Sequence, residues 1–410
     1  MCFDGGIRKN TSVFLSSHTG HGGFVQYDFD SIIDRRGGDS LKWNIPLDQI
    51  AMWYADADFA SAPEIVQALV TRASHGVFGY AHEPTELRRS IVARMHELYQ
   101  WHIHEEDIVP VPGIIPGFNI ASRAFGSPGA GVVVQEPTFY PIRRDLALHH
   151  MVPQPAALRR TNVDAQIVYR YDPDAFEAAC DETTRLAMLC HPHNPTGLVF
   201  RRDDLLHMAM VCVSRGIVLC SDEIHCDIRL DDTPHIPIAS LSEAIAHQTV
   251  TLMSPSKAFN IPGLVCGYAI IQNPDLRHLY LRAMAGMVPA PTIFAQIGTQ
   301  AALTSGDPWV RQANAYYAAN RDYAIAYIHT HMPNLRCTHP SATYLLWIDC
   351  SLAGIPGLAR DFFAAHGVAL GDGTPFGDDC AAFVRLTLAC PRGVLAAGLD
   401  AMRRAMATLC

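Results

Sequence analysis

The chain has 410 residues, 49% apolar and 17% charged, which suits a folded protein of two or three domains and excludes a disordered chain. Its 31 basic and 40 acidic side chains give a net charge of −9. Because no basic cluster interrupts this balance, we expect no nucleic-acid partner and no anionic membrane surface.

The N-terminal region, residues 1–26, is rich in Gly, Ser and His and is expected to form a loose arm. It lacks the apolar core of a signal peptide, and no apolar run of the chain approaches the ~20 residues of a membrane helix. The 12 cysteines include no C-x-x-C pair, and several lie inside apolar runs. These features predict a cytoplasmic protein with free thiols.

Apolar residues at helical spacing predict three helices in the first third of the chain. The first follows a capping Ser61 and a first-turn Pro63 and ends near Gly76. The second begins at about Thr85 and has an apolar face formed by Leu87, Ile91 and Leu98. The third is a short amphipathic helix between Gly113 and Gly126.

The middle of the chain alternates between β-prone apolar runs and helix-like stretches such as residues 203–215. This alternation predicts a parallel sheet buried on both faces. A helical region from about Thr292 leads into a C-terminal α+β segment. The five β-prone runs are Gly131–Gln135, Leu186–Cys190, Ile217–Ser221, Val250–Ser254 and Tyr268–Ile271.

Polar or aromatic residues follow four of these runs, at the edge of an α/β sheet where ligands bind. A lysine near buried strands, Lys257, has the setting of an amine nucleophile with a lowered pKa. Asp222 could hold a protonated heterocyclic nitrogen, and Phe139 could stack on its ring. Phosphate could be cradled by the hydroxyls of Ser254 and Ser256 and by backbone amides near Gly113. Together these groups describe a pyridoxal 5'-phosphate (PLP) site.

Several motifs carry a family resemblance. SPSKAFNIPG (254–263), NPTG (194–197) and SDEIH (221–225) resemble the fold-type I PLP enzymes of the class I/II aminotransferase superfamily. The stretches SLKW (40–43), MWYADADF (52–59), HGVFGY (75–80) and FVRLTLACPR (383–392) are similar to the MalY/PatB-type cystathionine β-lyases, or C–S lyases. The resemblance extends from about Tyr27 to the C-terminus.

This resemblance implies an α/β fold with a large PLP-binding domain, residues 60–290, whose mostly parallel seven-stranded sheet lies between helices. A smaller α+β domain would combine residues 27–59 with residues 291–410. The resemblance also implies a homodimer in which Tyr80 reaches the cofactor phosphate of the neighbouring subunit.

The resemblance also assigns roles to individual residues. Lys257 would form the Schiff base and act as general base, while Asp222 would pair with the pyridine nitrogen. Arg385 would bind the substrate α-carboxylate. The remaining expected contacts are Phe139 stacked on the ring, Asn194 at the phenolic oxygen and the substrate, His225 beside the cofactor, Gly113, Ile114 and Ser254 at the phosphate, and Tyr54 and Tyr140 near the substrate Cβ.

Three positions depart from the family pattern. His191 stands where asparagine is frequent, and Phe139 where tyrosine is usual. Val265 replaces an arginine that many aminotransferases carry eight residues after the lysine. This last change favours a C–S β-lyase, which would convert L-cystathionine or cysteine S-conjugates to a thiol, pyruvate and ammonia. An aminotransferase on the same fold is the alternative.

Two readings from other classes of enzyme are weaker. Ser254 and Lys257 fit the S-x-x-K motif of serine acyl-transferring enzymes, but the companion S-D-N and K-T-G motifs are absent. His191, His193 and His225 could be read as zinc ligands, yet no H-E-x-x-H or cysteine spacing supports them. We therefore expect no metal.

Overall fold

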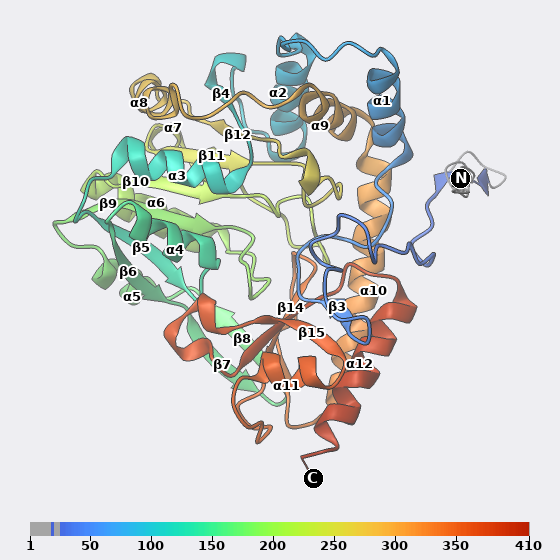
Figure 1. Ribbon diagram of the computed structural model, residues 1–410. Coiled ribbons are helices and arrows are strands. Elements are labelled where there is room, and N and C mark those ends of the chain that lie inside the picture. The colour runs from blue at the N-terminus through green and yellow to red at the C-terminus, as the bar shows by residue number, and fades with distance from the viewer. Residues whose placement is uncertain (1–17, 20–24, 410) are drawn as a thin grey trace, which may run out of the picture.

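The computed structural model describes residues 18–19 and 25–409, so most of the expected N-terminal arm lies outside the described residues. Two short strands, β1 (His18–Thr19) and β2 (Val25–Gln26), pair antiparallel at its start. The rest of the described chain forms two seven-stranded sheets with helices packed around them (Figure 1).

The first sheet is mostly parallel, as the sequence predicts: only β12 runs antiparallel to its neighbours. The five predicted runs all form strands of this sheet, with ends shifted by one or two residues. In spatial order the strands are β4 (Ile108–Val111), β12 (Gly267–Ile270), β11 (Thr249–Met253), β10 (Val218–Asp222), β9 (Thr184–Cys190), β5 (Gly131–Glu136) and β6 (Val152–Ala157).

Both faces of this sheet are buried, which explains the continuous apolar runs. Val132 packs in the same core as Phe118 of α3, whereas its neighbour Val133 shares the opposite core with Met208 of α6. One face is covered by α3 (Ile114–Phe125), α4 (Tyr140–Leu148) and α8 (Pro274–Met284). The other is covered by α5 (Pro173–Ala179), α6 (Arg202–Arg215) and α7 (Glu243–Ala246).

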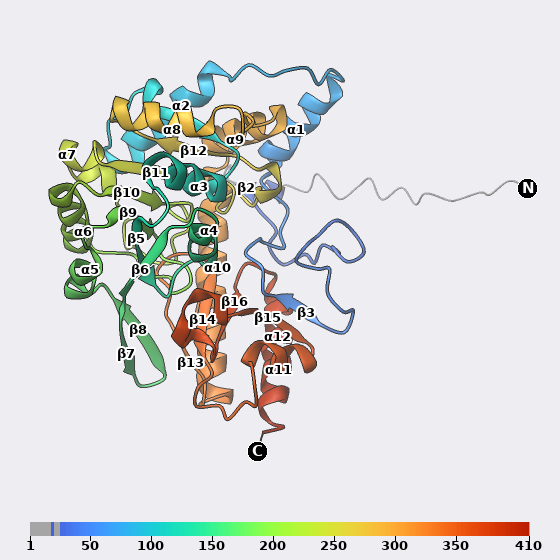
Figure 2. The same cartoon turned by 60° about the vertical axis from the view of Figure 1, so that its left-hand side comes forward.

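Five strands of the second sheet come from residues 27–59 and 291–410, the ranges expected for the small domain, and a hairpin from the middle of the chain extends it. This hairpin, β7–β8, falls inside the 60–290 range expected for the large domain, yet β8 pairs with β13 (Figure 2). The strands in order are β3 (Ile50–Met52), β15 (Val368–Asp372), β16 (Phe383–Thr387), β14 (Leu345–Asp349), β13 (Arg336–Cys337), β8 (Gln166–Arg170) and β7 (Arg159–Val163).

The remaining helices link the two sheets. The long α10 runs from the side of the first sheet down to the second, where it packs on α12 (Figure 2). Among the helices of the described chain, none combines the length and hydropathy needed to span a bilayer. These helices are α1 (Pro63–Ser74), α2 (Thr85–Tyr99), α9 (Ile293–Ser305), α10 (Asp307–His331), α11 (Ala359–Ala365) and α12 (Arg392–Met406).

Two local expectations are wrong. Ser61 does not cap α1, because its hydroxyl donates to the backbone oxygen of Asn260 and the N-cap position belongs to Ala62. Leu98 is exposed although it shares helical spacing with Leu87, since the last turn of α2 presents Tyr99 to the core instead.

Candidate active site

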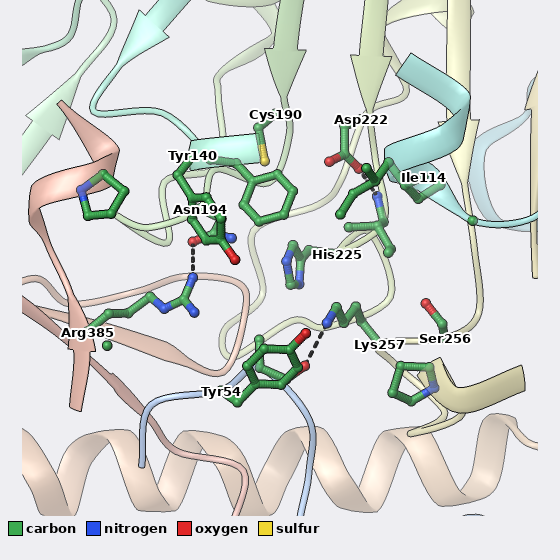
Figure 3. Close-up of a pocket in the computed structure, with 18 of the residues that line it drawn as sticks. Tyr54, Ile114, Tyr140, Cys190, Asn194, Asp222, His225, Ser256, Lys257 and Arg385 are labelled. Atoms are coloured by element: carbon green, nitrogen blue, oxygen red, sulfur yellow. Dashed lines mark hydrogen bonds between the residues drawn. The ribbon is translucent and has the colours of Figure 1, made fainter. Parts of the chain in front are cut away.

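A cavity of about 570 Å³ opens at the carboxyl ends of β9, β10 and β11, between the two sheets (Figure 3). Eleven residues assigned to the site from the sequence line it. Those expected around a cofactor ring and phosphate are Gly113, Ile114, Phe139, Asn194, Asp222, Ser256 and Lys257. The others are His225, Tyr54, Tyr140 and Arg385.

Lys257 follows β11 and extends its amine into the cavity (Figure 3). Its Nζ donates a hydrogen bond to the backbone oxygen of Ala55 at 2.6 Å. Desolvation, together with the nearby positive charge of Arg385, lowers the pKa of Lys257 to about 8. The unprotonated form of this amine, which a nucleophile requires, is therefore far more populated at neutral pH than in an ordinary lysine.

Asp222 ends β10 and is buried, with Oδ1 accepting a hydrogen bond from the backbone N–H of Ile224 at 3.1 Å. Burial raises its pKa to about 7, and nearby Lys257 offsets this only in part. Asp222 forms no ion pair with any of the described residues. A cationic ligand in the cavity would stabilise the ionised form of this buried, unpaired carboxylate.

Backbone geometry at Gly113 creates an anion-binding corner. Gly113 is the N-cap residue of α3 with φ of 106°, a left-handed conformation that a side chain would strain. It leaves the first N–H groups of α3 free to face the cavity. Gly267 lies directly behind, where a Cβ atom would come within 3.5 Å of the Gly113 Cα.

The two serines before Lys257 have different positions. The hydroxyl of Ser254 donates to the backbone oxygen of Cys266 at 2.5 Å and accepts from the N–H of Ser256 at 3.1 Å. Ser254 therefore shapes the turn and does not line the cavity, contrary to its expected contact with phosphate. Ser256 does line the cavity, and its hydroxyl is the one available there.

Arg385 and Asn194 form the opposite wall. The Arg385 Nη1 donates to Oδ1 of Asn194 at 3.0 Å (Figure 3). Its Nη2 donates to the backbone oxygen of Trp53 at 3.3 Å. The Nε of Arg385 is buried without a hydrogen-bond partner among the described residues, and burial lowers the pKa of this guanidinium to about 10. A buried arginine with an unused donor is suited to binding a carboxylate.

Tyr80 is the one expected site residue far from this cavity. It is fully exposed and lines a separate shallow hollow with Arg72 and Gln296. Within this single chain, Tyr80 can therefore contribute nothing to the site around Lys257.

Two of the three histidines that could suggest a metal make hydrogen-bond contacts within the fold. His193 Nδ1 lies 2.8 Å from the Thr196 hydroxyl, and His191 Nε2 lies 3.2 Å from the backbone oxygen of Ile236. Burial lowers the pKa of His193 and of His225 to about 3, so both are neutral. No group of three metal-ligating side chains occurs in the described part of the chain.

The S-x-x-K reading also fails on geometry. Ser254 and Lys257 lie in turns after β11 rather than at the start of an α-helix. The Ser254 hydroxyl is hydrogen-bonded to a backbone oxygen, away from Lys257 Nζ. No serine nucleophile is activated here.

Among the lining residues not assigned to the site from the sequence are Trp53, Cys190, Arg360 and Asp372. Cys190 ends both β9 and the predicted run Leu186–Cys190, so its position at the carboxyl end of a strand was a usable signal. Arg360 and Asp372 had no such signal, because they reach the cavity from α11 and β15 in the second sheet.

A family model described as aminotransferase class I and II matches residues 51–402. The chain belongs to this family. PatB of Bacillus subtilis (strain 168), a cystathionine beta-lyase, is 32% identical over 92% of this chain and 100% of its own length. The expected family is thus confirmed.

Solved structures agree with this assignment. The crystal structure of OvoB superposes with a TM-score of 0.88 at 38% identity, covering 93% of this chain and 99% of OvoB. Cystalysin from Treponema denticola, which contains a pyridoxal 5'-phosphate cofactor, gives a TM-score of 0.89 at 26% identity over 94% of this chain and all of its own. The predicted fold-type I architecture is therefore confirmed.

Proposed function

We propose that this protein is a PLP-dependent C–S β-lyase that acts on L-cystathionine or related cysteine S-conjugates. The observation that carries the proposal is the presence of Lys257, Asp222 and Arg385 on the walls of one cavity. The cystathionine beta-lyase PatB and the PLP-containing cystalysin support both the reaction and the cofactor.

The cavity fits PLP at both of its ends. The buried Asp222 carboxylate, which forms no ion pair with any described residue, would hold the protonated ring nitrogen. The α3 N-terminus at Gly113 and the Ser256 hydroxyl would bind the phosphate, and Phe139 would lie against the ring. When bound, PLP supplies an electron sink that stabilises negative charge at the substrate Cα.

The chain's own groups then have distinct tasks. Arg385 holds the substrate α-carboxylate and so fixes the Cα–H bond relative to the amine of Lys257. Lys257, whose pKa is lowered to about 8, removes the Cα proton as general base. Tyr54 and Tyr140 line the same space, where they would lie beside the departing sulfur.

An aminotransferase is the second candidate, because it would use the same cofactor residues. Val265, where many aminotransferases carry an arginine, lines the cavity without adding charge, which favours the lyase. Incubation with L-cystathionine and no keto acid separates the two. The lyase produces pyruvate and free thiol in equal amounts, whereas turnover that requires an added keto acid would establish the aminotransferase.

We also propose a homodimer in which Tyr80 completes the neighbouring site. Tyr80 is fully exposed and closely follows two further exposed apolar side chains, Val77 and Phe78, a pattern typical of a subunit interface. Light scattering of the purified protein tests the dimer: a monomer at micromolar concentration contradicts it.

The proposed location is the cytoplasm. Ten cysteines of the described chain are buried and free, which suits a reducing compartment. Fractionation of cells that express the tagged protein is the direct test.

A further inference from the structure

A second arginine lines the cavity on the same side as Arg385. Arg360 lies in the first turn of α11, and its partner Asp372 ends β15. Strand β15 runs beside β16, and Gly371 of β15 pairs with Arg385 of β16. Asp372 is the next residue of β15, so the Arg360–Asp372 pair lies beside the proposed carboxylate site. The proposed function assigns neither residue a task.

The Arg360–Asp372 pair is fixed by hydrogen bonds, but one donor group of Arg360 is left without a partner among the described residues. Arg360 Nη1 donates to Asp372 Oδ2 at 2.9 Å, and Nε donates to Asp361 Oδ1 at 2.9 Å. Asp372 is fixed in turn, since its Oδ1 accepts from the backbone N–H of Thr374 at 3.0 Å. The Arg360 Nη2 makes no hydrogen bond to another described residue, and 42% of the side chain is exposed.

The charges decide what this pair could recognise. Arg385, buried and aimed at Asn194, is committed to the substrate α-carboxylate, so Arg360 is the cation left for any other anionic group of the substrate. In a C–S lyase, that other group belongs to the fragment that leaves with sulfur. The pair offers one cation and one anion side by side, which matches a fragment carrying both a carboxylate and an ammonium group.

We propose that Arg360 and Asp372 form a subsite for the leaving thiol, selecting thiols that are themselves amino acids. Arg360 binds the distal carboxylate through Nη2, and Asp372 receives the distal ammonium. The inference rests on the proposed C–S lyase function, and it adds the class of leaving group to it.

The first test compares two substrates that differ only at the distal end. L-cystathionine carries the distal carboxylate and ammonium, whereas S-propyl-L-cysteine lacks both. In the holoenzyme, Arg360→Gln is expected to raise KM for L-cystathionine about tenfold with kcat little changed, and to leave S-propyl-L-cysteine unaffected. Arg360→Lys is expected to recover part of the loss, and Arg201→Gln, which removes an exposed arginine paired with Asp204, changes neither substrate.

Equal losses for both substrates, or no loss for either, would overturn the subsite. If the wild-type enzyme forms pyruvate from neither substrate, the lyase proposal fails, but the affinity for a substrate analogue still tests the role of Arg360.

This analogue is 2,7-diaminosuberate, in which a methylene replaces the sulfur of cystathionine. Calorimetry measures its affinity for the holoenzyme. Arg360→Gln is expected to weaken its binding about tenfold and to leave 2-aminoheptanoate unchanged; equal binding of 2,7-diaminosuberate by both proteins contradicts the proposal.

Discussion

The amine of Lys257 and the carbonyl of Ala55 lie 2.6 Å apart, although 202 residues separate them in the chain. The Tyr344 hydroxyl donates to the same carbonyl oxygen at 3.0 Å. Two residues further on, the N–H of Ala57 donates to Asn260 at 3.0 Å. The segment from Ala55 to Ala57 is therefore fastened to the turn that carries Lys257, and it holds the amine in the cavity.

The same segment is anchored from its other side by a buried ion pair. Lys42 Nζ donates to Asp58 Oδ2 at 2.7 Å, and Trp43 Nε1 donates to Asp58 Oδ1 at 2.7 Å. Asp58→Asn would leave the fully buried Lys42 ammonium without its charged partner, which costs about 3 kcal/mol of the free energy of unfolding. Urea unfolding measures this loss.

The matched control for this ion pair is Asp172→Asn. Asp172 pairs with the exposed Arg159 and caps α5, and asparagine keeps the cap. We expect no measurable change in its urea midpoint. Equal midpoints for Asp58→Asn and the wild type would show that the buried pair does not stabilise the fold.

Cofactor capture by the PLP-free protein should depend on pH through Lys257. Because desolvation lowers the pKa of Lys257 to about 8, the reactive unprotonated amine increases as pH rises through 8. The rate of PLP capture, followed by absorbance, is therefore expected to rise with a midpoint near 8 and to level off above it. A midpoint near the ordinary lysine value of 10.5 would contradict a desolvated amine.

Replacing Arg385 by lysine tests the α-carboxylate site. Lysine keeps the positive charge but loses the planar fork that contacts Asn194 and the backbone oxygen of Trp53. KM for L-cystathionine and for S-propyl-L-cysteine is expected to rise by about 100-fold. The rise in KM is expected for both substrates because both carry the α-carboxylate. A rise for only one of them would show that Arg385 does not bind this group.

Tyr80 gives a test of shared sites. If it acts in the neighbouring subunit, Lys257→Ala and Tyr80→Ala chains that are each inactive should recover activity when mixed as dimers. A random mixture would hold about a quarter of its sites with both native residues. Assays of the co-expressed chains measure the recovery. No recovery would be seen if Tyr80 served its own subunit, and a Tyr80→Ala chain that is active by itself would show that Tyr80 serves no site.

The sequence predicted those site residues that follow strands, because one physical rule places them together. Lys257, Asp222 and Asn194 each come directly after an apolar run, and parallel strands bring such ends to one edge. Arg360 and Asp372 could not be found this way. They reach the cavity from the second sheet, whose position depends on long-range packing that no local pattern encodes.

Two further contacts depend on the fold and not on any local sequence pattern. The partner of Lys257 is the backbone carbonyl of Ala55, and since every residue has a carbonyl, no residue type marks this one. Ser254 and Ser256 are the same residue type two positions apart. Only the fold of the turn decides that Ser254 bonds to Cys266 and Ser256 faces the cavity.

Borohydride reduction of the holoenzyme, followed by peptide mapping, tests most directly that this cavity holds PLP through Lys257. Reduction fixes the cofactor to the amine that carries it. We predict one phosphopyridoxyl group per chain, attached to Lys257, and none in the Lys257→Ala variant. A label on another lysine, or a wild-type protein that takes up no label when PLP is supplied, would contradict the account.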